Sequence, residues 1–96
     1  MFTTNGVNIL NPKGQHAATA RNELWANTIV DGLNAWADNP IQKSKEEVFI
    51  VNQWRKNTVV LLEQSSWSVI ATCKPYRLDP QAVATLLNVG YEQGAL

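Results

Sequence analysis

Residues 48–73 have the sequence VFIVNQWRKNTVVLLEQSSWSVIATC, and this stretch decides the fold class. Three runs rich in β-branched and aromatic residues, 48–54, 59–62 and 67–73, are separated by short polar segments. Such runs with short connections predict three strands of an antiparallel meander. The third run alternates apolar and hydroxyl side chains, whereas the first two are apolar on both faces. We therefore expect one face of the sheet to be well buried and the other to be partly covered.

A long helix is predicted before the meander, over residues 17–38. At 100° per residue its apolar side chains form one stripe: Ala18, Trp25, Ile29, Leu33 and Trp36. Gly32 lies within this stripe and costs about 1 kcal/mol relative to Ala, which suggests either that another element approaches the helix there or that the helix bends. Asn39-Pro40 ends the helix, because the residue before a proline is pushed out of the α region.

A second helix is predicted after the meander, where Asp79 offers an N-cap and Pro80 occupies the first helical position. Gly90 is the expected C-cap. The sequence thus predicts a single small α+β domain over residues 1–96. Its order is αβββα with both helices packed on the sheet, and residues 91–96 form a tail. Residues 1–15 form an N-terminal arm, which is either a short strand or a loop that packs two apolar side chains on the core. Double-stranded-RNA-binding domains share this order. However, residues 79–83 lack the lysines with which that family begins its second helix, so no family is assigned.

The composition narrows the classes of function. Eight basic and eight acidic residues give a net charge of zero, and only 17% of the chain is charged, against about 25% in soluble domains. Ten Asn and six Gln supply much of the remaining polarity. A strong nucleic-acid binder would carry a basic excess. We expect no signal peptide and no membrane span, because the longest apolar run is residues 59–62, and we expect a cytoplasmic protein.

The sequence contains no recognisable catalytic or metal-binding motif. One Cys and one His lie 57 positions apart, so paired metal ligands are missing, and the glycines do not cluster into a phosphate loop. We therefore expect no cofactor, no metal and no enzyme activity. Cys73 follows apolar positions of its strand and is expected to be a small buried hydrophobe. A hydrolase that uses Cys73 as its nucleophile is a third possibility, after the two binding functions below.

The meander brings candidate binding residues together. The turn after the first strand and the end of the third lie at the same end of the sheet. This end should gather basic and aromatic side chains, namely Trp54, Arg55, Lys56, Lys74, Tyr76 and Arg77. The opposite end should be acidic. Trp67 opens the third strand and is a further candidate, since strand-end tryptophans are often half exposed and Trp is enriched at interface hot spots.

The preferred function is a small non-enzymatic protein-interaction module that forms a homodimer. Four tryptophans and an amide-rich surface of low charge favour it, because interface cores are rich in aromatic residues and poor in charge. An accessory or inhibitory protein of a phage or mobile element, acting on a host protein, is the setting we expect. The alternative is nucleic-acid or nucleotide binding at the basic end, where Trp54 or Tyr76 would stack on a base.

Overall fold

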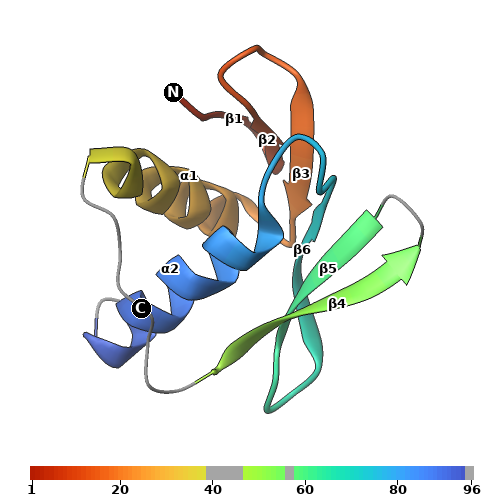
Figure 1. The fold of residues 1–96 in the computed structure, drawn as a ribbon, viewed down its shortest axis with the longest axis vertical. Coiled ribbons are helices and arrows are strands. Elements are labelled where there is room, and N and C mark those ends of the chain that lie inside the picture. The colour runs from red at the N-terminus through yellow and green to blue at the C-terminus, as the bar shows by residue number, and fades with distance from the viewer. Residues whose placement is uncertain (39–46, 56–57, 95–96) are drawn as a thin grey trace.

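The computed structural model describes residues 1–38, 47–55 and 58–94. Within these residues the chain forms a six-stranded antiparallel sheet with strand order β1-β2-β3-β6-β5-β4. Helices α1 and α2 both lie on one face of this sheet (Figure 1). In chain order the elements are β1 (Thr3–Asn5), β2 (Asn8–Leu10), β3 (His16–Ala20), α1 (Glu23–Asp38), β4 (Phe49–Arg55), β5 (Thr58–Glu63), β6 (Ser68–Cys73) and α2 (Pro80–Glu92).

The α+β class, the two helices and the meander β4–β6 follow the prediction, but the order αβββα is wrong. The N-terminal arm forms β1 and β2, and residues 16–20, which were predicted to lie largely in the first helix, form β3. Alanine favours helix in isolation, yet Ala17, Ala18 and Ala20 are all buried where β3 pairs with β6. Tertiary packing of small side chains has outweighed local helix propensity there.

Helix α1 starts later than predicted and α2 ends later. Asn22 caps α1, since its Oδ1 accepts a hydrogen bond of 2.9 Å from the Trp25 N–H. The predicted cap of α2 is confirmed: Asp79 Oδ1 accepts from the Gln81 N–H at 3.0 Å. Gly90 is not the C-cap, because α2 continues through it to Glu92, and the glycine with positive φ is Gly94 at +77°. The predicted stop at Asn39-Pro40 lies outside the described residues.

The core lies between the sheet and the two helices. Its largest fully buried members come from every layer: Ile9, Ile29, Leu61, Ile70, Val83 and Leu87. The close approach predicted at Gly32 is confirmed, because a Cβ added there would lie 2.6 Å from Leu86 Cδ1 of α2. Phe49 packs edge-on against Trp25 and Tyr91, with ring centroids 5.8 and 6.4 Å away, and so ties β4 to both helices.

The described chain consists of two similar halves, β1-β2-β3-α1 and β4-β5-β6-α2. The strand order lists the first half and then the second in reverse, which is what an approximate two-fold axis between β3 and β6 produces. The central ladder pairs Ala18 with Cys73, Thr19 with Thr72 and Ala20 with Ala71. Beyond each end, Arg21 N donates to Ile70 O at 2.7 Å and Lys74 N donates to Ala17 O at 2.8 Å. We found no internal repeat in the sequence, so the repetition is one of architecture.

Two side-chain amides repeat across the same axis. Asn34 of α1 accepts from the Phe2 N–H at 2.9 Å and donates to the Phe2 carbonyl at 3.0 Å. Asn88 of α2 does the same to Phe49, at 2.7 and 2.9 Å. Both phenylalanines lie at the start of an edge strand of the sheet. Each helix therefore binds the outward backbone groups of its own edge strand, as a short neighbouring strand would.

Candidate functional site

The sheet has a face that neither helix covers, which we call the outer face. Strand register and the alternation of side chains place one row of outer-face residues across five strands: Asn52, Val60, Thr72, Thr19 and Asn8. A second row joins Ile50, Leu62 and Val69 across β4, β5 and β6. Over the second half of the molecule these outer-face residues are apolar apart from Asn52 and Thr72, whereas over the first half they are the polar Asn8 and Thr19.

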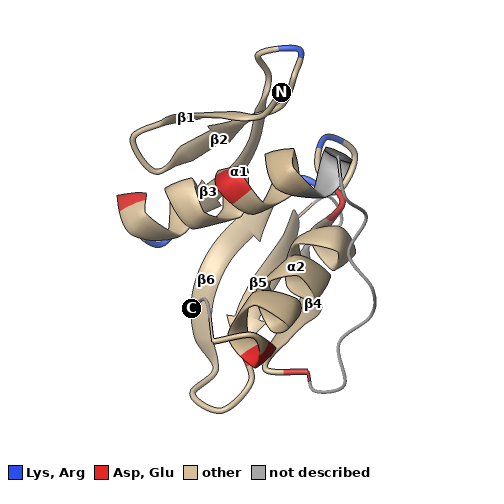
Figure 2. Ribbon diagram, turned by 90° about the vertical axis from the view of Figure 1, so that its left-hand side faces the viewer, with Lys and Arg blue, Asp and Glu red and all other residues tan. Residues whose placement is uncertain are grey.

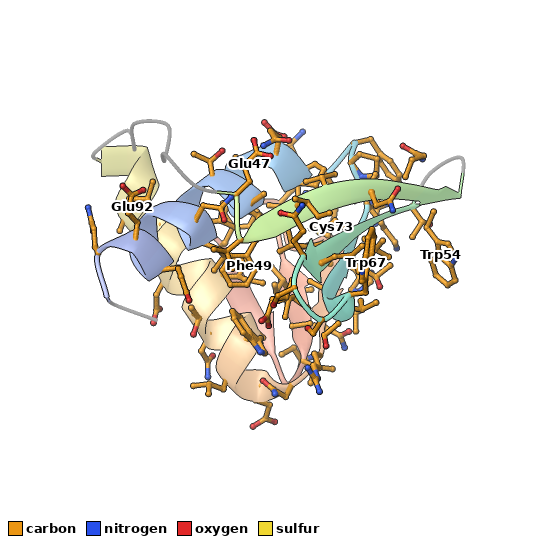
Figure 3. All side chains as sticks on the ribbon, turned by 90° about the horizontal axis from the view of Figure 1, so that it is seen from below. Glu47, Phe49, Trp54, Trp67, Cys73 and Glu92 are labelled. Atoms are coloured by element: carbon orange, nitrogen blue, oxygen red, sulfur yellow. The ribbon has the colours of Figure 1, made fainter. Side chains whose placement is uncertain are left out.

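The apolar half of the outer face ends in two exposed tryptophans. Val60 and Leu62 are buried, yet they do not belong to the core cluster between sheet and helices. Val69, Trp54 and Trp67 keep 45%, 59% and 64% of their surface exposed. Figure 3 shows both indoles on the side of the molecule away from α1 and α2. We call this surface the tryptophan face; it consists of Ile50, Trp54, Val60, Leu62, Trp67 and Val69.

Trp67 is held in an unfavourable backbone conformation. It lies in the turn between β5 and β6 with φ of +56°, the one positive φ outside glycine among the described residues. The left-handed region costs an L-residue about 1–2 kcal/mol, and turns usually place Gly or Asn there. Since the indole is mostly exposed, burial does not by itself account for a tryptophan at this position. Strained positions of this kind cluster at functional sites.

The predicted basic end is assembled from the loop between β6 and α2. Arg77 Nη1 donates to the His16 carbonyl at 3.0 Å, and its guanidinium lies over the Tyr76 ring, 5.2 Å from the centroid. Register brings the backbone of Arg55 to the same end of the sheet, two strands away from Lys74. Lys56 lies outside the described residues. Trp54 lies at this end and Trp67 at the opposite end of β5, so the predicted site residues are not all gathered at one end of the sheet.

Charge is sparse on the sheet itself. Among the described strands, the charged residues are Arg55 and Glu63, and each ends its strand. Figure 2 shows the strands otherwise in the colour of uncharged residues, with Lys and Arg mostly in connecting segments. The tryptophan face therefore presents an apolar surface without a charged group among its six residues.

His16 is a site residue that the sequence reasoning missed. Its Nε2 is hydrogen-bonded to Thr19 Oγ1 at 2.8 Å, and Thr19 Oγ1 donates to Asn8 Oδ1 at 3.2 Å. Burial lowers the pKa of His16, and the positive charges of Lys74 and Arg77 lower it further. The predicted helix over residues 17–38 hid this arrangement. The turn at residues 11–14 between two apolar runs could have indicated a hairpin that carries His16 into the sheet.

Cys73 is buried on the helix side of β6, with 1% of its surface exposed. Burial raises the pKa of its thiol to about 12. The side chain therefore remains a protonated thiol at neutral pH, and a nucleophilic thiolate is not available there. In the described ranges, no three His, Cys, Asp or Glu side chains come together as metal ligands would.

Compared with known proteins, the chain matches no family model, no curated protein and no solved structure. Of the two helices in the described ranges, neither combines the length and the apolar character needed to cross a bilayer.

Proposed function

We propose that the chain is a non-enzymatic protein-interaction module that docks through its tryptophan face. One observation carries the proposal: two tryptophans, 59% and 64% exposed, border an apolar sheet face, and one of them is kept in a strained conformation. Exposed aromatic side chains around an apolar centre are the composition of an interface core. The strain at Trp67 is explained when the indole contributes binding energy rather than stability of the fold.

The occupant of this face is a second copy of the chain. A two-fold interface brings the same patch of both copies together, so the patch must be complementary to itself. An apolar face without charge meets this condition, because no like charges are brought together. The two indoles alone still expose about 300 Å² per copy, taking about 250 Å² for a whole Trp side chain. That is more than a third of the roughly 800 Å² that each partner buries in a standard interface.

Sedimentation equilibrium over a wide range of concentration tests this proposal. The parent chain is expected to be a dimer, and Trp67→Ala is expected to weaken dimerisation by at least about tenfold, as loss of an interface hot spot does. Leu24→Ala is the matched control, because Leu24 is 74% exposed on α1, away from the outer face. Its dimerisation should equal that of the parent.

Two results would contradict the homodimer. A parent chain that stays monomeric at every concentration would overturn it in favour of a different protein as occupant. That occupant would be the host protein expected for an accessory or inhibitory protein of a phage or mobile element. An equal loss in Leu24→Ala and Trp67→Ala would show that the tryptophan face has no special part in association.

A further inference from the structure

A second surface, separate from the tryptophan face, lies where the loop between β6 and α2 meets β3. Two hydrogen bonds, from Lys74 N and Arg77 Nη1, hold this loop on the strand, and a third lies within the loop. Lys74 N donates to Ala17 O at 2.8 Å, Arg77 N donates to Lys74 O at 3.0 Å, and Arg77 Nη1 donates to His16 O at 3.0 Å. The loop is therefore anchored, and the side chains of His16, Lys74 and Arg77 arise from a defined backbone.

Within the part of the chain that the structure describes, no carboxylate is found to offset the effect of the two positive charges on His16. Among the described residues, the charged groups that act on the His16 imidazole are Lys74 and Arg77, and both disfavour its protonation. Asp79, the acidic residue nearest along the loop, has an Oδ1 that accepts the helix-capping hydrogen bond from Gln81 N. A chain of zero net charge thus concentrates positive potential at one end of β3, and an anion would relieve the repulsion.

An aromatic ring adjoins this cluster. Tyr76 keeps 63% of its surface exposed, and the Arg77 guanidinium lies over its ring. Rings and guanidinium planes of this kind are the groups on which single nucleobases stack. A phosphate and a planar base could therefore be recognised side by side, the phosphate by the cations and the base by Tyr76.

We propose that His16, Lys74, Tyr76 and Arg77 form a binding site for a nucleoside monophosphate. The phosphate is held by the Lys74 and Arg77 cations and by the His16 imidazole, which gains a proton when the anion binds, and the base stacks on the tyrosine. A single nucleotide fits this site better than a nucleic-acid strand does, because polymer binding typically uses about six to ten phosphate contacts. The cluster offers two permanent cations and one imidazole that a bound anion would protonate, and the remainder of the chain brings no basic excess.

The chain contains one histidine, so its imidazole resonances in an NMR titration report on this site without ambiguity. The probes are adenosine monophosphate, inorganic phosphate, adenosine and a short single-stranded oligonucleotide, each at low salt. The first two are expected to raise the pKa of His16, because a bound anion stabilises the imidazolium. The monophosphate should bind about tenfold more tightly than phosphate, as base stacking adds affinity, and adenosine should bind least.

Matched variants separate this site from general electrostatics. Lys74→Gln is expected to weaken binding of the monophosphate by about tenfold, through loss of one charge-assisted hydrogen bond. Arg21→Gln is the control, because Arg21 follows β3 as Lys74 follows β6 and lies at the other end of the central ladder. It removes the same charge and should leave binding unchanged. Tyr76→Leu should abolish the preference for the monophosphate over phosphate.

Several results would overturn the site. His16 resonances and pKa that do not change with any probe would exclude anion binding there. Adenosine binding as tightly as its monophosphate would exclude phosphate recognition, and much tighter binding of the oligonucleotide would make a nucleic-acid strand the ligand. If Arg21→Gln and Lys74→Gln weakened binding of the monophosphate equally, the net charge of the chain, and not a defined site, would explain the binding. None of these results depends on whether the chain is a dimer.

Discussion

The two halves of the molecule share a scaffold and differ in the chemistry of their outer faces. Each half has three strands and a helix, and each helix binds the backbone of a phenylalanine through an asparagine amide. The outer face of the first half carries Asn8, His16 and Thr19, whereas that of the second carries Val60, Leu62 and Val69. Edge strand β1 has three residues and edge strand β4 has seven. The features that the halves share belong to the scaffold, and the features in which they differ include the residues for which we propose binding.

The strongest test of the two-fold relation exchanges Gly32 of α1 and Leu86 of α2, the residues at which the two helices come into contact. Gly32 and Leu86 are 54 positions apart, as are Asn34 and Asn88, so they occupy equivalent places. Leu86→Gly alone should lower the free energy of unfolding by about 4 kcal/mol, from the lost side chain and the glycine in a helix. Gly32→Leu alone should also destabilise the chain, because even a Cβ there meets Leu86.

The double variant Gly32→Leu with Leu86→Gly should recover at least half of the summed loss. The leucine side chain then comes from α1 and the glycine that receives it from α2, so the helices can pack as before. Chemical denaturation of the parent, both single variants and the double variant measures this coupling. A double variant whose loss equals the sum of the two single losses would show that the halves are not equivalent at this contact.

The side-chain amides of Asn34 and Asn88 should contribute differently to the free energy of unfolding. Asn88 is buried, and its removal leaves the N–H and C=O of Phe49 without these partners, so Asn88→Ala should cost about 3 kcal/mol. Asn34 is only partly buried, and water can replace it, so Asn34→Ala should cost about 1 kcal/mol. Denaturation midpoints of the two variants decide the order. Equal losses would contradict the view that burial sets the difference between the halves.

The thiol of Cys73 gives the second half a pH dependence in the alkaline range, and Ala20 stands in the corresponding strand position of the first half. The pKa of this thiol is raised from 9.0 to about 12 in the folded chain. Below pH 9 both folded and unfolded chains keep the proton, so stability is unaffected. Above it only the unfolded chain releases the proton, and the free energy of unfolding should fall by about 1.4 kcal/mol per pH unit.

Denaturation of the parent and of Cys73→Ala at pH 8 and pH 10 measures this loss. The parent should lose about 1.4 kcal/mol more than the variant between the two values. A parent and a variant that respond alike to alkali would show that the thiol is exposed in solution. Slow labelling of the native thiol by a disulfide reagent gives an independent check.

The smallest expected change in stability is that of Trp67→Asn. Asparagine tolerates positive φ and should recover about 1–2 kcal/mol of strain. The buried third of the indole, about 90 Å², is lost at a similar cost of about 2 kcal/mol. We expect the free energy of unfolding to change by less than about 1 kcal/mol while dimerisation weakens at least as much as in Trp67→Ala. A large destabilisation would make Trp67 a structural residue.

The sequence predicted the second half of the fold far better than the first. Residues 48–73 and the pair Asp79-Pro80 carry strong local signals, namely β-branched runs and a capping residue before proline. Ala17 to Ala20 have no such signal, because alanine tolerates either structure and the outcome depends on pairing with β6. That pairing joins Thr19 to Thr72 and leaves no trace in a short sequence window.

Part of the candidate site could be predicted from the sequence for the same reason. Lys74, Tyr76 and Arg77 lie close together in the chain, so their proximity in space followed from a single predicted loop. His16 comes to them from a strand that was predicted as the edge of a helix. The exposure of Trp54 and Trp67 could be predicted because tryptophans at strand ends are often half exposed. The positive φ of Trp67 could not, because it depends on the geometry of one turn.

The two-fold relation has a consequence for how this chain can vary. In a symmetric dimer of separate βββα chains, one gene specifies both copies, and every substitution appears twice. Here both copies lie in one polypeptide, so a tryptophan can be placed at the β5–β6 turn while the β2–β3 turn keeps Gly14 at a φ of +77°. One half can therefore carry residues that its counterpart does not, while both keep the shared core.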